Sequence, residues 1–252
     1  GCINYQGEVW YRKHFTPEQS WKGKQQFLHF EAIMGKSKIW VNGKLLKEHF
    51  GGFLPVIVDV TPYLNYGEDN VIAVCADNSD DPSYPPGKPQ DALDFAYFGG
   101  IYRDCWMIVH NHVFITDPNY ENETAGGGLF VSFDKVSEQS ALLKLDAHIR
   151  NNSEKSFSGK IVYELYDRND NRVLSKETNL SVNNGKAKQS SCKATIETPH
   201  LWSPDSPYLY KLHVYVKDRA ENIIDGYYRR IGIRSVEFKG KDGFWLNGKP
   251  YP

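Results

Sequence analysis

The sequence has 252 residues, enough for one or two domains with a sizeable core. Its 30 Lys and Arg residues nearly balance 31 Asp and Glu residues, so the overall charge gives no reason to expect binding to nucleic acid or to an anionic membrane surface. Hydrophobic residues make up 40% and charged residues 24%, which argues against wholesale disorder. The 16 Tyr, 13 Phe and 6 Trp favour β structure, because aromatic side chains suit half-buried pleated surfaces.

Short apolar and aromatic segments bounded by turn-forming residues predict strands through the first half of the chain. These segments are 8–15, 26–33, 37–42, 55–60, 70–76 and 104–110. Asn42-Gly43 predicts a hairpin that joins the strand at 37–42 to the segment after it. The long segment 77–104 separates the last two strands, and connections of that length in compact domains are usually functional or disordered.

From residue 117 onward, turn signals introduce a second series of strands. They are 129–133, 141–150, 159–167, 188–196, 208–217 and 223–233. In 141–150, apolar and polar residues alternate, as in a half-buried antiparallel strand. We find no amphipathic helix of convincing length, so the strand–helix alternation of an α/β enzyme is missing. The predicted fold class is therefore all-β, with two β-sandwiches in series and a boundary near residue 116.

The four cysteines form no metal or redox motif. Cys2, Cys75, Cys105 and Cys192 are too far apart in sequence for Cys-x-x-Cys. Cys75 and Cys105 lie in predicted strands, and two buried thiols are favoured over a disulfide between them.

No apolar run approaches the ~20 residues of a membrane span. The sequence begins without Met, and removal of a signal peptide would favour a periplasmic or extracytoplasmic location over a cytoplasmic one.

The segment 77–104 combines carboxylates, an arginine and aromatic residues. Carboxylates accept hydrogen bonds from sugar hydroxyls, and aromatic faces cover the apolar face of a pyranose. The segment is therefore a candidate sugar-binding loop. The alternative is an acidic, solvated loop that packs its aromatic residues against the sandwich, and composition alone does not separate the two.

Other candidate clusters predict structure rather than chemistry. His110 and His112 share one strand face, but two histidines without a third ligand do not predict a metal site. Trp40 and Trp106 lie in predicted strands and are expected in the core rather than as sugar platforms. Trp202 is expected to wedge between the second sandwich and the segment that follows it.

The run Gly99-Gly100-Ile101-Tyr102-Arg103-Asp104-Cys105-Trp106 resembles the G-G-I-Y-R-D-V-W signature of glycoside hydrolase family two, which includes β-galactosidases, β-glucuronidases and β-mannosidases. Other stretches match that family in the same order along the chain. They are WYRK at 10–13, IWVNGK at 39–44, GGF at 51–53, DVT at 59–61, NVIAV at 70–74, HLWSP at 200–204, RIGIR at 230–234 and FWLNGKP at 244–250.

The resemblance implies three parts. A jelly-roll (galactose-binding-like) sugar-binding domain is expected over residues 1–116 and an immunoglobulin-like β-sandwich over 117–235. The start of a truncated (β/α)8 catalytic barrel is expected over 236–252. Such a barrel needs about 250 residues. The family's two catalytic glutamates would therefore lie outside this sequence, so no catalytic residue and no metal ligand is assigned. The fragment alone is expected to be inactive and to need no cofactor; any sodium or magnesium ion would belong to the full-length enzyme.

The resemblance also implies an aspartate on the long loop that contacts the substrate hydroxyls. Counting back from the signature places Asp94 at that position, with Asp91 as a nearby competitor. The predicted substrate-binding residues are Asp94, Asp91, Tyr97 and Asn78. Arg103 and Asp104 are expected to form a structural ion pair rather than to bind substrate.

The predicted function is that of the N-terminal accessory part of a retaining exo-β-glycosidase, with β-galactosidase favoured. Its role would be to shape the substrate pocket and support the absent barrel. A β-glucuronidase or β-mannosidase fragment and a non-catalytic carbohydrate-binding or adhesion module are the alternatives. An acidic loop favours a neutral hexose, because carboxylates repel a uronic acid. The expected partners are an oligosaccharide or β-galactoside, the chain's own barrel and, in the full-length protein, a second copy.

Overall fold

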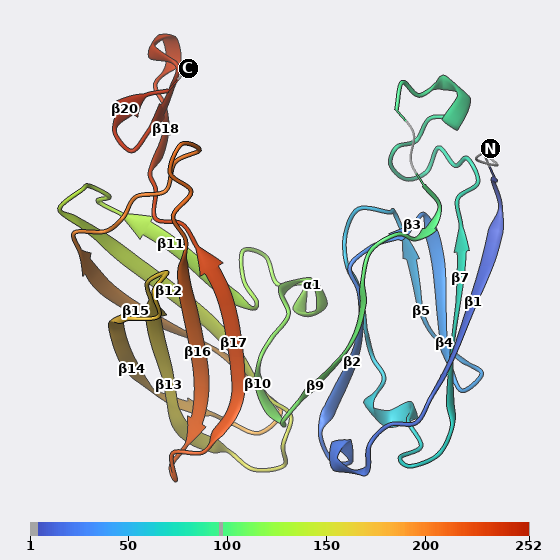
Figure 1. Cartoon of the computed structure of the whole chain (residues 1–252). Coiled ribbons are helices and arrows are strands. Elements are labelled where there is room, and N and C mark those ends of the chain that lie inside the picture. Colours follow the sequence, from blue (N-terminus) through green and yellow to red (C-terminus); the bar gives the residue numbers. More distant parts are fainter. Residues whose placement is uncertain (1–4, 96–97, 252) are drawn as a thin grey trace. The chain divides into compact units, whose positions relative to one another are not determined.

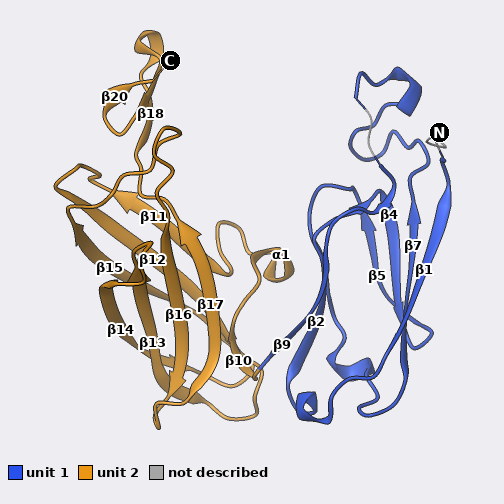
Figure 2. Ribbon diagram, in the orientation of Figure 1, with its two compact units in different colours: residues 1–110 blue, residues 111–252 orange. Residues whose placement is uncertain are grey.

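The computed structural model describes residues 5–95 and 98–251 (Figure 1). The chain divides into two compact units, Gly1–His110 and Asn111–Pro252 (Figure 2). Both units consist of strands, and the longest helix among the described residues is α1 (Pro118–Glu121). The other helical segments are single 3-10 turns: η1 (Gln19–Trp21), η2 (Thr61–Tyr63), η3 (Gln90–Ala92) and η4 (Gly240–Asp242). The prediction of an all-β fold is confirmed.

The first unit is a jelly-roll β-sandwich built from antiparallel pairs. One sheet has the order β1-β7-β4-β5, with β1 (Glu8–Phe15), β4 (Lys36–Val41), β5 (Lys44–Phe50) and β7 (Asn70–Asp77). The facing sheet has the order β6-β2-β9, with β2 (Gln25–Phe30), β6 (Val56–Asp59) and β9 (Cys105–His110). Two short strands, β3 (Ile33–Met34) and β8 (Gly100–Ile101), pair beside them.

Alternation of side chains along each strand builds the core of this sandwich. Ile39, Val41 and Val74 point inward and are almost fully buried against Val58 of the facing sheet. The predicted hairpin is present: β4 turns into β5 at Asn42 (φ 49°) and Gly43 (φ 80°). Two successive positive φ angles are the requirement of the type I′ turn, which explains the Asn-Gly pair.

The second unit is an immunoglobulin-like sandwich of two antiparallel sheets. In one, β12 (Ser140–Asn151) pairs with three strands: β10 (Val113–Ile115), β11 (Leu129–Asp134) and β15 (Ala187–Glu197). The other has the order β14-β13-β16-β17, with β13 (Phe157–Tyr166), β14 (Arg172–Val182), β16 (Tyr210–Asp218) and β17 (Ile223–Ile231).

The alternation predicted for 141–150 is confirmed in β12. Leu143, Leu145 and Ile149 are at most 1% exposed and lie in the core of the second unit. The chain passes from the first unit to the second after His110, whereas the expected boundary lay near 116. The difference arises because β10 pairs with the end of β12, which places Val113 in the second sandwich.

A small antiparallel sheet follows the second sandwich. It consists of β18 (Val236–Phe238), β19 (Phe244–Leu246) and β20 (Lys249–Pro250). Trp202 lies where this sheet joins the sandwich: its N–H donates to Ile233 O at 2.8 Å and its carbonyl accepts from Asn247 Nδ2 at 3.0 Å. The backbone of Trp202 therefore links the second sandwich to this sheet, and its ring lies 4.5 Å from the guanidinium of Arg234.

Two expectations for the strand before the domain boundary are wrong. Cys105 is exposed, with a pKa raised to about 11 by partial burial and by Asp104, whereas Cys75 is buried as expected. Both cysteines are free thiols. Trp106 is 54% exposed rather than in the core, because alternation along β9 directs its neighbour Met107 toward the core and Trp106 to the outer face. Within the described part of the chain, no helix has the length and apolar character needed to cross a membrane.

Candidate functional site

A long loop leaves β7 at Asn78, returns at Gly99, and projects beyond the strand ends of the first unit (Figure 1). Its two ends touch. A Cβ atom on Gly99 would lie 2.5 Å from Nδ2 of Asn78, so only glycine fits there. Gly100 has a φ of +84° and lies against the Tyr11 hydroxyl, so it also requires glycine. The Gly-Gly pair of the signature closes the base of the loop.

Asn78, one of the predicted substrate-binding residues, lies in this closed base. Its side chain is 8% exposed. Its Oδ1 accepts a hydrogen bond from Gly7 N at 2.9 Å, and its Nδ2 donates to Tyr5 O at 2.9 Å. Both polar atoms of the amide are thus engaged by the segment that precedes β1, and the structure assigns Asn78 to the support of the loop.

The first part of the loop is fixed to β4. Lys36 Nζ lies 2.5 Å from the carboxylate of Asp81, whose Oδ1 also accepts from the backbone N–H of Ser83 at 2.8 Å. These contacts lower the pKa of Asp81 to about 2, with the Lys36 hydrogen bond as the largest cause. Tyr84 packs edge-on against Phe50 with ring centroids 6.3 Å apart. An ion pair and an aromatic contact therefore hold the loop on the sheet.

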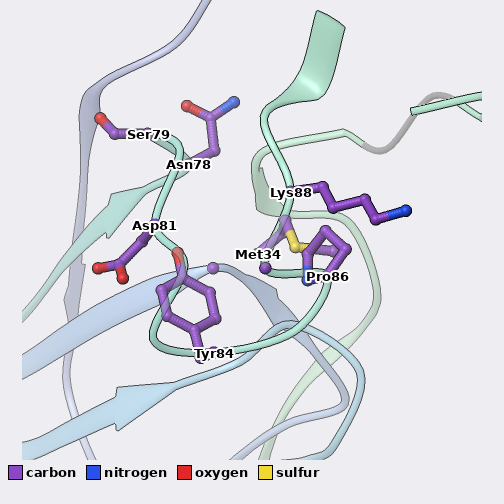
Figure 3. A pocket seen from close by; sticks show the side chains of 9 residues that line it. Met34, Asn78, Ser79, Asp81, Tyr84, Pro86 and Lys88 are labelled. Atoms are coloured by element: carbon purple, nitrogen blue, oxygen red, sulfur yellow. The ribbon is translucent and has the colours of Figure 1, made fainter. Parts of the chain in front are cut away.

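These contacts enclose a cavity of about 10 Å³, shown in Figure 3. It is lined by Met34, Gly35, Asn78, Ser79, Asp81, Tyr84, Pro86, Gly87 and Lys88. A cavity of that volume has room for one water molecule. It is too small for a sugar ring, so it belongs to the loop's internal packing and is not the substrate site.

The acidic residues nearest β7 are also engaged inside the loop. Asp77 Oδ1 accepts from Ser79 N at 2.9 Å, and Asp80 Oδ1 accepts from Gln90 N at 3.0 Å. Gln90 Nε2 in turn donates to Asn78 O at 2.9 Å. Both carboxylates thus accept from backbone N–H groups, Asp77 within a local turn and Asp80 across the loop.

The distal part of the loop differs. Asp91 and Asp94 are exposed, and within residues 5–95 and 98–251 neither forms a hydrogen bond or an ion pair. Phe95 and Phe98 beside them are 53% and 74% exposed. Tyr97, also predicted to bind substrate, lies outside the described residues. Unengaged carboxylates and open aromatic faces on a braced loop can receive sugar hydroxyls and a pyranose face.

A second loop shares this end of the unit and was not assigned a role from sequence. Gly52, in the connection from β5 to β6, accepts a hydrogen bond from the Tyr102 hydroxyl at 2.5 Å. Phe53 next to it is 54% exposed. Arg103 lies over the Tyr102 ring at 5.7 Å, and no ion pair between Arg103 and Asp104 is found in the described chain, so that expectation is wrong. The sequence offered Gly51-Gly52-Phe53 as one of the stretches that match the family. Only the fold shows that Gly52 is hydrogen-bonded to Tyr102 of the Gly-Gly-Ile-Tyr-Arg-Asp run.

A larger cleft of about 620 Å³ opens between the edge strands β1 and β9. Its lining residues are Tyr11, Arg12, Lys13, Phe15, Leu28, His29, Phe30, Ile72, Val74, Ile101, Cys105, Trp106 and Met107. That lining contains no carboxylate and no side-chain amide, the acceptors that a site for several sugar hydroxyls needs. We therefore take the distal loop as the candidate site.

Among the described residues, no cluster of three or more His, Cys, Asp or Glu side chains is arranged to hold a metal ion.

Comparisons with known proteins agree with this architecture. Residues 2–111 match the family model described as glycosyl hydrolases family 2, sugar binding domain, and residues 128–234 match glycosyl hydrolases family 2. A β-galactosidase of Thermoanaerobacter pseudethanolicus is 33% identical over 98% of this chain and 31% of its own length. A β-glucuronidase of Formosa agariphila is 31% identical over 97% of this chain and 25% of its own.

Solved structures give the same result. The crystal structure of a Bacteroides uniformis β-glucuronidase matches with a TM-score of 0.86 and 30% identity, over 98% of this chain and 29% of that one. The chain thus spans less than a third of the length of these relatives.

Proposed function

Because this chain belongs to the glycosyl hydrolases of family 2, we propose that it is the N-terminal part of a retaining exo-β-glycosidase, with β-galactosidase as the favoured activity. One observation carries the proposal. On a loop braced at its base, Asp91 and Asp94 are exposed and form no hydrogen bond or ion pair with the described residues, beside exposed phenylalanine rings. That arrangement suits the reception of a sugar and has no role in holding the sandwich together.

In this proposal the chain supplies binding and not bond cleavage. A retaining glycosidase needs two carboxyl groups about 5 Å apart across the scissile bond. We place both on a catalytic barrel outside these residues, which the segment from residue 236 would begin. The braced loop would border the pocket, where Asp94 accepts hydrogen bonds from substrate hydroxyls. Holding the loop in place before substrate binds lowers the entropy lost on binding.

Charge supports a galactoside over a glucuronide as the substrate. Asp91 and Asp94 would repel the carboxylate of a glucuronide and accept hydrogen bonds from the hydroxyls of a galactoside. β-Glucuronidase is the second candidate, because relatives with that name are nearly as similar to this chain as the β-galactosidase is, at 31% against 33% identity.

The test measures kcat/KM of the full-length protein on 4-nitrophenyl β-galactoside and β-glucuronide. We expect Asp94→Ala to lower kcat/KM on the galactoside by about 10- to 100-fold, the loss of a hydrogen bond to a charged group. Asp205→Ala, at an exposed aspartate of the second unit, is the matched control and should change nothing. Unchanged activity of the Asp94 variant would remove this residue from the site. Hydrolysis of neither substrate would favour a non-catalytic module.

A further inference from the structure

Two tryptophans stack on the outer face of the four-stranded sheet of the first unit. The ring centroids of Trp10 in β1 and Trp40 in β4 are 5.1 Å apart, with 29° between the ring planes. Trp10 is 60% exposed, and Trp40 is half-buried. Trp40 was expected in the core, but alternation along β4 directs its neighbours Ile39 and Val41 inward and Trp40 outward.

The sheet register explains how the rings meet across an intervening strand. Trp10 pairs with Cys75 of β7, and Trp40 pairs with Ala73 of the same strand. Both β7 residues have small side chains, so the two indoles can lean together above them. We call Trp10 and Trp40 the indole pair. It leaves a large aromatic surface open to solvent, and exposed apolar surfaces of this kind commonly mark interaction sites.

Polar groups around the indole pair suit a neutral, hydroxyl-rich ligand. Arg12 and Lys38 lie on the same face, and Lys38 Nζ is 3.5 Å from Glu48 of β5. Glu8 of β1 adds a second carboxylate to this face. With Lys36 and Asp77, which share the row of Glu8, three cations and three anions give no net charge, which favours neither a polyanion nor a polycation. A pyranose can place its C–H face on an indole and direct its hydroxyls toward such groups.

The indole pair is also continuous with the candidate sugar-binding loop. The next outward row of the sheet is Glu8, Asp77 and Lys36, and Lys36 is the residue that binds Asp81 of the loop. Successive outward rows on a strand lie about 7 Å apart. The base of the loop therefore lies about one row, roughly 7 Å, from Trp10 on the same outer face.

We propose that the indole pair is a binding site for a neutral oligosaccharide chain, with one pyranose ring stacked on the open face of Trp10. This inference rests on the proposed function, because it identifies the substrate class as an extended neutral saccharide. A second protein copy, or another part of the same polypeptide, seated on the indole pair is an alternative that the experiment separates.

The experiment measures retardation of the full-length protein in native gels containing β-1,4-galactan or galactomannan, two neutral polysaccharides. We expect Trp10→Ala to weaken binding about tenfold while kcat/KM on a 4-nitrophenyl glycoside stays unchanged. Trp106→Ala is the matched control, because this indole is similarly exposed, at 54%, but lies on the facing sheet. It should leave retardation at the parent value.

Three results would overturn the proposal. They are no retardation of the parent protein by either polysaccharide, equal retardation of parent and Trp10→Ala, and a change of the Trp10 variant's oligomeric state, which would show that a second protein copy covers the indoles. Failure of the proposed function gives a different result. In that case the full-length protein does not hydrolyse 4-nitrophenyl glycosides but is still retarded by the polysaccharides.

Discussion

Replacing Asn78 with alanine should destabilise the first unit, because the structure uses this side chain to close the loop base. The substitution removes two hydrogen bonds, one with Gly7 N and one with Tyr5 O, each 2.9 Å long. Each is worth about 1 kcal/mol, and leaving partly buried partners unsatisfied adds to the loss. We expect the free energy of unfolding of the first unit to fall by about 2–3 kcal/mol.

Urea denaturation, followed by the fluorescence of the tryptophans in the first unit, measures this change. The matched control is Asn65→Ala in the same unit, since Asn65 is exposed and its side chain forms no hydrogen bond within the described residues. The control should stay within about 0.5 kcal/mol of the parent. If Asn78→Ala unfolds at the parent's urea concentration but loses kcat/KM in the full-length protein, the side chain contacts substrate and our assignment is refuted.

Further predictions concern the loop and the second core. Gly99→Ala should destabilise the first unit by about 1–3 kcal/mol, because its Cβ would lie 2.5 Å from Asn78 Nδ2; an unaltered urea midpoint would contradict this. The pKa of Asp81 is about 2 against an ordinary 3.8, so its ionised form stabilises the fold above pH 3.8 and this stabilisation is lost as the pH falls through 2. Lys36→Met should raise that pKa, measured by NMR titration of the carboxyl group. Leu143→Ala should cost the second unit about 2–5 kcal/mol and leave the first unit's unfolding unchanged, which calorimetry can resolve as two transitions.

Local pattern was sufficient for much of the fold. The strand predicted at 8–15 is β1, residue for residue, because alternation and flanking turn residues act within one segment. The strand β14 (Arg172–Val182) was missed, since it is an edge strand with many polar, exposed residues and lacks an apolar run. An edge strand is held by backbone hydrogen bonds to its neighbour, which composition does not reveal.

The sequence shows which residue types the long loop contains, but it does not show the role of each residue. The sequence places six aspartates between residues 77 and 104, and only the family resemblance singled out Asp94 and Asp91 among them. The fold separates Asp77, Asp80 and Asp81, which bind backbone N–H groups or Lys36, from the exposed Asp91 and Asp94. The partner residues come from other parts of the chain or from turns whose geometry depends on the closed loop base.

The sequence by itself determined the fold class, the order of the two sandwiches and the family resemblance, because periodicity, turn residues and the Gly-Gly-Ile-Tyr-Arg-Asp run are local properties. Only the tertiary structure decided which polar side chains brace the loop and which face solvent. It also moved Trp40 from the expected core to the stacked pair with Trp10. The physical reason is that burial and pairing depend on contacts between residues far apart in sequence, such as Lys36 with Asp81 and Asn78 with Gly7.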